Sequence, residues 1–207
     1  PIRSVAPASA AASGRLQQAV DMAVAAEAAG QTDRAIDAWK AVLRQDAAHL
    51  EARANLVRLY TASARWNNLV ELYRQELEAL GGVRPGPEAA QNKERKLEVL
   101  REMVVIYRDR LALEPMVVQT YNALLGLELG DRDALGALVQ SYEKLGRYTD
   151  VIKVLDQQAA HADDPAEKVA LLRRIALLWV ERFNNVNNAT RPLEQIVEIN
   201  PTDADAL

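Results

Sequence analysis

His49 and His161 are the only histidines of the sequence, and histidine is a common metal ligand and general base. Neither has the companions that such chemistry requires, because the chain has no cysteine and neither histidine has a second one nearby. The spacings His-x-x-x-His and His-Glu-x-x-His do not occur. We therefore predict structural roles for both residues near helix ends, and neither a metal nor a cofactor.

Two further segments have part of the pattern of a ligand-binding loop. The sequence from Asp131 begins like a calcium loop, but Leu135 replaces the third acidic ligand and Tyr142 stands at the closing glutamate. The glycine-rich stretch 81–87 lacks the Gly-Lys-Ser/Thr ending of a phosphate-binding loop. We expect Asp131 and Asp133 to cap a helix and 81–87 to be a connector.

Seven aromatic residues could form either a ligand cage or a hydrophobic core. They recur at matching places along the chain, and they are Trp39, Trp66, Tyr73, Tyr107, Tyr121, Tyr142 and Trp179. Regular recurrence is more typical of packing between helices than of a single cage. We predict that these side chains are core residues.

The composition favours helices and argues against several functions. Of the 207 residues, 49% are hydrophobic and 26% are charged, with many Ala, Leu, Glu and Arg residues. The net charge of −4 does not favour binding to nucleic acid, and no apolar run reaches the roughly 20 residues of a membrane span. The lack of cysteine is compatible with cytoplasm or periplasm. We expect a soluble all-α protein, and the usage of Ala and Arg suggests a bacterial source.

The sequence repeats itself. The segment 96–135 reappears as 168–207, and the segment 49–77 reappears as 131–159. Apolar residues recur at helical spacing from about residue 15 onward, with turn signals at short intervals. Repeats of this size cannot bury an apolar face alone, so they stack on their neighbours. We predict ten helices in five antiparallel hairpins, stacked as an α-solenoid.

Turn residues set the expected boundaries. Gly30 and Gly146 are suited to the left-handed conformation at a helix end, and Asp164 followed by Pro165 starts the last hairpin. We expect a flexible linker over 1–14, an inserted loop over 81–91, a polar turn over 184–188 and the start of a truncated next unit over 203–207. The hairpin units are expected at about 15–48, 49–80, 92–130, 131–162 and 164–202.

This pattern resembles the tetratricopeptide repeat (TPR), a helix-turn-helix unit of about 34 residues. The residues that carry the resemblance are Tyr60, Tyr107, Tyr142 and Trp179 near the end of a first helix, Gly30 and Gly146 in the turn, Ala35 and Ala189 on the second helix, and Pro201 after it. Four of the five units lack the closing proline, and loops are longer at Gly81 and Asn184. The resemblance implies a non-catalytic, right-handed superhelix whose concave wall is lined by the first helix of each pair.

On that wall, helical spacing exposes the face opposite the expected core residues Leu56, Leu100, Leu138 and Ile175. The candidate partner-binding residues on this face are Asn55, Arg58, Arg101, Arg108, Gln140, Lys144 and Arg173. Because a guanidinium matches the planar geometry of a carboxylate, we predict a groove for an acidic or extended peptide. The alternative is a solvated face that binds nothing.

Three classes of function follow. The first is a non-catalytic protein–protein interaction scaffold that binds a partner or peptide on the concave face. The second is a structural or self-associating part of a larger bacterial envelope or motility complex, held together through the open ends of the solenoid. The third is an enzyme, which would need a deep pocket with clustered titratable groups. The oligomeric state is open at this stage.

Overall fold

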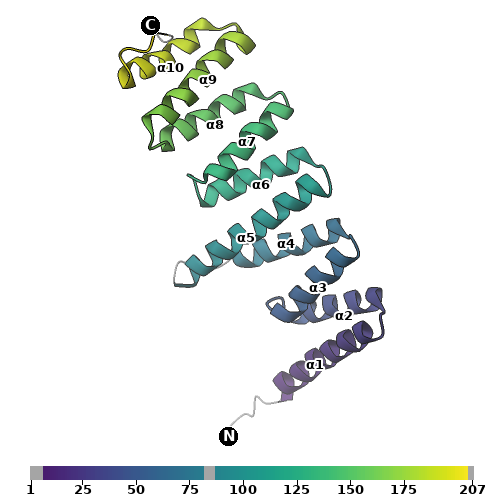
Figure 1. Ribbon diagram of the computed structural model, residues 1–207. Coiled ribbons are helices and arrows are strands. Elements are labelled where there is room, and N and C mark those ends of the chain that lie inside the picture. The colour runs from purple at the N-terminus through teal and green to yellow at the C-terminus, as the bar shows by residue number, and fades with distance from the viewer. Residues whose placement is uncertain (1–6, 82–86, 205–207) are drawn as a thin grey trace. The chain divides into compact units, whose positions relative to one another are not determined.

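The computed structural model describes residues 7–81 and 87–204, with side chains from residues 13 and 89 onward in these two ranges. Within these ranges the chain forms ten α-helices and no strand (Figure 1). The prediction of an all-α fold is therefore confirmed. The chain divides into two compact units, residues 1–92 and 93–207.

The first unit contains two stacked hairpins. Its helices are α1 (Pro7–Ala28), α2 (Thr32–Gln45), α3 (Leu50–Ala62) and α4 (Trp66–Gly81). Helix α2 packs against α1 on one side and against α3 on the other, and α3 packs against α4. Trp39 of α2 and Leu56 of α3 are each only 1% exposed, so the seam between the hairpins is hydrophobic.

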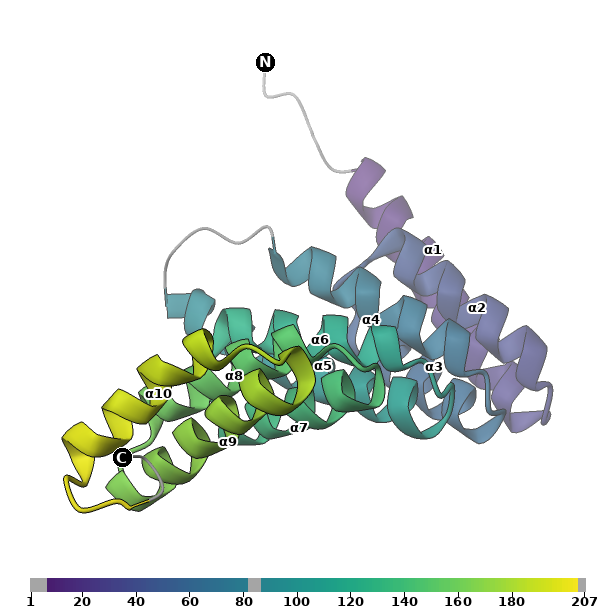
Figure 2. The same ribbon diagram turned by 90° about the horizontal axis from the view of Figure 1, so that it is seen from above.

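The second unit contains most of α5 and the five helices that follow it. The bounds are α5 (Pro87–Asp109), α6 (Glu114–Leu127), α7 (Arg132–Lys144), α8 (Tyr148–His161), α9 (Pro165–Phe183) and α10 (Val186–Ile199). Consecutive helices from α6 to α10 pack against one another in chain order. In this unit α6, α8 and α10 lie on one side, and α7 and α9 lie on the other (Figure 2). Within each unit the predicted stacking of hairpins is thus confirmed.

Every hairpin turn contains one residue with a left-handed backbone conformation. Gly30 and Gly146 have φ angles of 68° and 67°, as the sequence predicted. Ala64, Ala112 and Asn184 take the same place in the other three turns, with φ angles of 54°, 53° and 48°. The turn geometry is therefore shared by all five hairpins, although only two of them use the glycine that adopts it without steric cost.

Side chains cap several helix starts. Asp131 accepts a hydrogen bond from the backbone N–H of Ala134 at 2.9 Å, and Asp164 caps α9 in a similar way, as predicted for both. His49 caps α3, because its Nδ1 accepts from the N–H of Ala52 at 3.2 Å. These bonds satisfy N–H groups that have no partner within the helix. The predicted structural role of His49 is confirmed.

Two predicted loop boundaries were wrong. Helix α1 begins at Pro7, inside the expected linker 1–14, because the segment that follows Pro7 is rich in alanine. Helix α5 begins at Pro87, inside the expected loop 81–91, because proline is tolerated in a first helical turn. The rest of these two segments, residues 1–6 and 82–86, lies outside the described residues. So do residues 205–207 of the expected next unit.

The start of α10 also differs from the prediction. The helix begins at Val186, inside the expected polar turn 184–188, because the side chain of Asn185 accepts from the N–H of Asn188 at 3.1 Å and caps it. Pro192 then lies inside the helix, where it is buried. Polar turn residues served here as a cap, which shortened the loop.

Candidate functional site

The seven predicted partner-binding residues all lie on first helices of the hairpins. The expected core residues opposite them are buried, with Leu56, Leu100, Leu138 and Ile175 each at most 6% exposed. The first unit holds Asn55 and Arg58 on α3. The second unit holds Arg101 and Arg108 on α5, Gln140 and Lys144 on α7, and Arg173 on α9. We call the surface of α5, α7 and α9 that carries these five residues the first-helix face.

In the first unit Arg58 supports a buried hydrogen bond. Its guanidinium bonds to the carboxylate of Glu27 and, at 3.1 Å, to the side-chain oxygen of Asn55. Glu27 in turn accepts from the indole Nε1–H of Trp39 at 2.5 Å. Because Trp39 is almost fully buried, this carboxylate satisfies a donor that water cannot reach. Arg58 and Asn55 therefore stabilise the packing of α1, α2 and α3.

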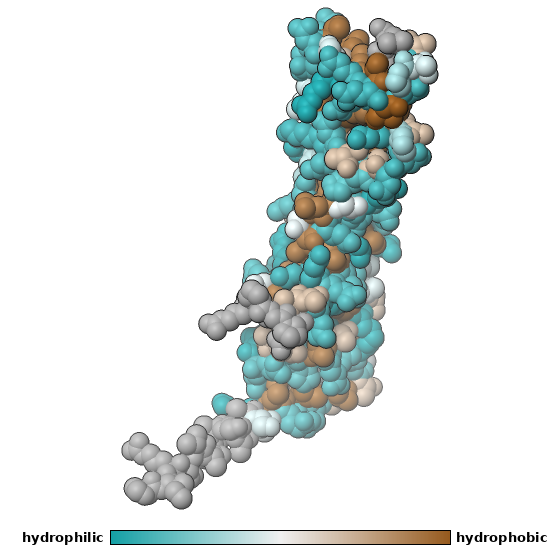
Figure 3. Space-filling model, turned by 90° about the vertical axis from the view of Figure 1, so that its left-hand side faces the viewer, coloured by the Kyte–Doolittle hydropathy of each residue, from teal (hydrophilic) through white to brown (hydrophobic). Residues whose placement is uncertain are grey.

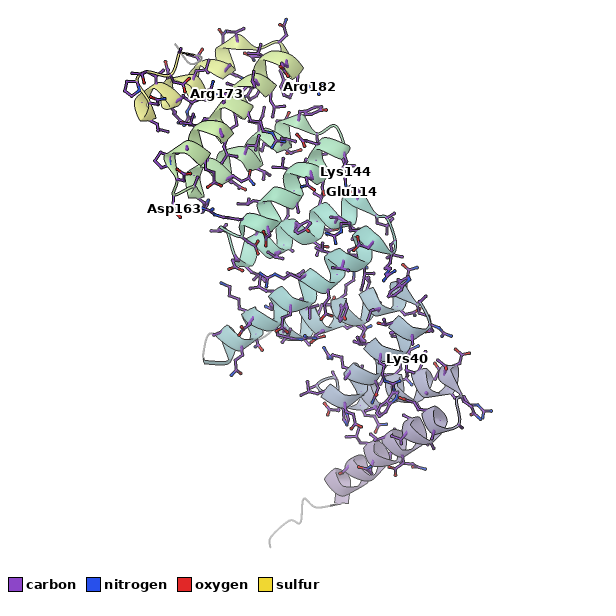
Figure 4. The ribbon with its side chains drawn as sticks, in the orientation of Figure 1. Lys40, Glu114, Lys144, Asp163, Arg173 and Arg182 are labelled. Atoms are coloured by element: carbon purple, nitrogen blue, oxygen red, sulfur yellow. The ribbon has the colours of Figure 1, made fainter. Side chains whose placement is uncertain are left out.

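In the second unit two arginines join one hairpin to the start of the next. The Nη2 of Arg101 on α5 lies 3.1 Å from the carboxylate of Asp131, which caps α7, and 3.5 Å from that of Glu128. Arg173 on α9, which is labelled in Figure 4, lies 2.8 Å from the carboxylate of Asp203. Because 96–135 aligns with 168–207, these are the same contact in two places.

The other charged candidates also have acidic neighbours. The Nζ of Lys144 lies 3.6 Å from the carboxylate of Glu114, and both are labelled in Figure 4. The Nε of Arg108 lies 2.7 Å from the carboxylate of its neighbour Asp109. Gln140 is an exposed polar residue on α7. An acidic ligand would therefore have to compete with, or add to, carboxylates that the chain itself supplies.

A small cavity opens on the first-helix face between α5, α6 and α7. Its volume is about 270 Å³, and its lining includes Arg101, Val105, Arg108, Tyr121 and Asp131. Burial raises the pKa of the Tyr121 hydroxyl above its ordinary value, although the charge of Arg108 acts in the opposite direction. This hydroxyl therefore stays neutral near pH 7 and can donate and accept hydrogen bonds.

Sequence reasoning missed the apolar residues of the first-helix face. Val105 is 47% exposed and Leu177 is 51% exposed, and each lies four residues after Arg101 or Arg173, on the same side of its helix. Val180, one turn further along α9, is 41% exposed. The signal was present, since Val105 and Leu177 occupy equivalent positions in the two aligned segments. Figure 3 shows exposed hydrophobic residues amid a mostly hydrophilic surface, including a group near the C-terminal end.

The prediction that the aromatic residues form the core is only partly correct. Trp39, Tyr73, Tyr107 and Tyr142 are at most 7% exposed. Trp66, Tyr121 and Trp179 are partly exposed, and the last two line cavities. The apolar periodicity could not distinguish these positions, because a partly exposed aromatic ring at a groove has the same helical spacing as a buried one.

The described residues contain no group of three or more His, Asp or Glu side chains that could hold a metal ion. The Nδ1 of His161 is hydrogen-bonded to the backbone carbonyl of Gln157 at 2.8 Å. No helix in the described ranges combines the length and the apolar character needed to cross a bilayer.

The tetratricopeptide repeat family model matches two segments, residues 52–85 and 134–169. The first segment covers most of α3 together with α4, and the second covers most of α7 together with α8 and the start of α9. The resemblance inferred from the repeats is confirmed: the chain contains tetratricopeptide repeats at these two segments. This repeat generally mediates protein–protein interaction.

Several solved structures resemble the chain. MamA is 15% identical, with 92% of this chain and 94% of MamA covered and a TM-score of 0.40. A tetratricopeptide repeat protein from Parabacteroides merdae is 17% identical, with 92% and 69% covered and a TM-score of 0.41. YrrB, a TPR protein with an unusual peptide-binding site, is 12% identical, with 91% and 88% covered and a TM-score of 0.42. No curated protein matches the sequence.

Proposed function

We propose that this protein is a non-catalytic interaction scaffold that binds an extended peptide segment of a partner protein on the first-helix face, which is concave in tetratricopeptide repeat arrays. The observation that carries the proposal is the recurrence of an arginine followed, one turn later, by an exposed aliphatic residue. Arg101 with Val105 on α5 and Arg173 with Leu177 on α9 form this pair on either side of α7.

The aliphatic residues supply the driving force for binding. Each leaves about half of its side chain in water, and burial of apolar surface contributes roughly 25 cal/mol per Å². Between them α7 presents Gly136 and Gln140, and a Cβ added to Gly136 would meet only the end of the Gln158 side chain at 4.0 Å. A small residue beside an amide leaves room for the main chain of a ligand and offers it a hydrogen-bond donor and acceptor.

The arginines favour a partner segment with an acidic side chain. Within the described residues both ion pairs of Arg101 start at Nη2, so Nη1 and Nε keep donors for a further carboxylate. A guanidinium can bind a carboxylate through two parallel hydrogen bonds. The preferred ligand would thus combine aliphatic or aromatic side chains with one or more carboxylates.

The test should spare the arginines, because Arg101 and Arg173 also join hairpins and their reversal would confuse binding with folding. A ligand can be selected from a random dodecapeptide display library, and its affinity measured by isothermal titration calorimetry. Val105→Ser combined with Leu177→Ser should weaken binding at least tenfold and leave the melting temperature nearly unchanged. The matched control is Leu129→Ser, since Leu129 is 72% exposed and lies between α6 and α7. Equal affinity of the double variant and the control would overturn the proposal.

A second candidate is self-association as a structural part of a larger assembly, such as a bacterial envelope or motility complex. It is favoured by an open cavity of about 640 Å³ between α1 and α2, lined by Met22, Ala25, Ala26, Ala38 and Ala41 among others. Met22 is 62% exposed. Sedimentation velocity over a hundredfold concentration range would test it, with Met22→Asp expected to abolish any dimer. A monomer at all concentrations would rule this function out.

A further inference from the structure

A further cavity lies away from the first-helix face. It has a volume of about 640 Å³ and opens between α8 and α10, with α9 as its floor. Sites for small ligands span about 300–1,000 Å³, so a few residues of a ligand fit this space. None of the residues proposed above to bind a partner lines it.

The floor of this cavity is apolar. Leu172 and Ile175 of α9 are each 2% exposed, and Trp179 follows them along the same helix with part of its ring accessible. The ring of Trp179 lies 5.0 Å from that of Phe183, which supports it. A partly exposed indole above aliphatic side chains is suited to pack against an apolar side chain of a ligand.

The charged groups of the cavity do not cancel. Lys168 and Arg191 are basic, and Asp156 is the one acidic residue of the lining. Within the described part of the chain neither Lys168 nor Arg191 makes an ion pair within 4.0 Å. The charge of Arg191 acts on the Asp156 carboxyl from a longer distance. One positive charge is therefore left for a ligand to balance.

Helix α10 supplies groups that match a peptide main chain. Asn187 and Gln195 line the cavity, and each side-chain amide offers both donors and an acceptor. Pro192, also in the lining, has no backbone N–H to donate to the carbonyl of Asn188, one turn earlier in α10. The two side-chain amides can therefore pair with the N–H and C=O groups of a peptide main chain.

The first unit offers a comparison. A cavity of about 330 Å³ opens between α2 and α4 above α3, in the corresponding arrangement. There Lys40 lies 3.8 Å from Asp37, and Gln75 donates to Glu71 at 3.2 Å, so these polar groups of the lining are paired within the chain. The cavity above α9 is about twice as large, and its cations are not paired in this way.

We infer that the cavity between α8 and α10 is a second peptide-binding site, which takes an extended segment with one carboxylate side chain beside an apolar one. The carboxylate faces Lys168, the apolar side chain packs on Trp179, and the peptide main chain bonds to α10. The two sites share α9 but use different residues of it, and this cavity also uses α8 and α10, so the two proposals stand or fall separately.

Nuclear magnetic resonance tests this with two acetylated and amidated tetrapeptides, Ala-Glu-Leu-Ala and Ala-Gln-Leu-Ala. The Glu peptide should shift the indole N–H signal of Trp179 and the side-chain amide signals of Asn187 and Gln195. The Gln peptide should bind at least fivefold more weakly. The indole signal of Trp39, which belongs to the first unit, should stay in place. Absence of a Trp179 shift at millimolar Glu peptide, or equal binding of the two peptides, would overturn the inference.

Variants sharpen the assignment. Lys168→Glu should weaken binding of the Glu peptide at least fivefold, and Asp156→Asn should tighten it. Lys153→Glu makes the same charge change on α8 outside the cavity lining, so it should leave the affinity unchanged. Equal losses in Lys168→Glu and Lys153→Glu would show a general charge effect and no site. The double variant Val105→Ser and Leu177→Ser should titrate like the wild type, and a loss of binding there would place the peptide on the first-helix face instead.

Discussion

The guanidinium of Arg173 donates to both carboxylate oxygens of Asp203, at 2.9 and 2.8 Å. Arg101 bonds to Asp131 in the equivalent place seventy-two residues earlier, at 3.1 Å. In the second case the aspartate also caps the next helix, α7. At Asp131, therefore, one residue both marks the start of α7 and connects α7 to α5, the first helix of the preceding hairpin.

The contribution of this contact can be measured with Arg101→Met and Asp131→Asn. Asparagine is as good a cap as aspartate, so this change removes the charge and keeps the start of α7. A double-mutant cycle by urea denaturation should give a coupling free energy of about 0.5–1 kcal/mol, modest because Arg101 is largely exposed. The coupling should shrink in 1 M salt. A coupling free energy of zero would mean that the ion pair does not contribute to stability.

Glu27 should matter more than an exposed carboxylate usually does. Glu27→Ala leaves the indole N–H of Trp39 without its acceptor in a buried place, which costs about 1–3 kcal/mol of unfolding free energy. Glu27→Gln retains an acceptor for the indole and loses only the charge opposite Arg58, so its cost should be clearly smaller. Thermal and urea denaturation compare the two variants, and equal losses would contradict the role given to this hydrogen bond.

Replacing Arg53 alone should destabilise the protein strongly, whereas replacing Arg53 and Glu76 together should cost much less. Their side chains are 13% and 7% exposed, and their charged atoms lie 3.2 Å apart. Arg53→Leu should cost about 3–5 kcal/mol, because Glu76 loses its guanidinium in a place with little water. The aligned residues in the second unit are Leu135 and Gln158, so Arg53→Leu combined with Glu76→Gln should recover most of the loss. Urea denaturation showing no recovery would contradict this.

The left-handed alanines offer a stabilising change. Ala64→Gly and Ala112→Gly relieve a positive φ that costs an L-residue roughly 1–2 kcal/mol, against a smaller entropic cost of glycine in the unfolded chain. Each variant should gain about 0.5–1 kcal/mol. The control Ala54→Gly, at an exposed helical position of α3, should lose about 1 kcal/mol. Losses in all three variants, measured by thermal unfolding, would show that the turns carry no strain.

Asp156 should make stability depend on pH. Burial raises the pKa of its carboxyl, and the charge of Arg191 offsets this only in part. A carboxyl whose pKa is higher in the folded state destabilises the fold as the pH rises from the pKa of the unfolded state to that of the folded state. The reason is that the folded state then holds a poorly solvated charge. Asp156→Asn should therefore stabilise the protein at pH 7 and lose this advantage below the ordinary carboxyl pKa of about 3.9. The check is urea denaturation of Asp156→Asn and the wild type at pH 7 and at pH 3. An equal gain in unfolding free energy at the two pH values would contradict a role for the Asp156 charge.

The sequence predicted the helices and their order well, because the apolar periodicity and the internal repeats report directly on packing. From helical spacing the sequence placed Arg101 and Arg173 away from the buried Leu100 and Ile175, and in the structure Arg101 is exposed while Arg173 is partly exposed. It did not predict their acidic partners. An ion pair between residues thirty positions apart depends on how two hairpins stack, and no local pattern encodes that distance.

The cavities were missed for a related reason. Trp179 has the same spacing as the buried Tyr107, yet it is partly exposed and lines the cavity between α8 and α10. The helix boundaries at Pro7 and Val186 were missed because alanine-rich and asparagine-rich segments are compatible with either loop or helix, and tertiary context decides between them.

The matched joints at Arg101 and Arg173 make the region between them a transferable cassette. It begins at Asp131, which the preceding Arg101 binds, and ends at Arg173, which binds the next aspartate, Asp203. An array of this design can grow or shrink by whole pairs of hairpins while every junction keeps the same chemistry, so its reach can change without a new interface having to arise.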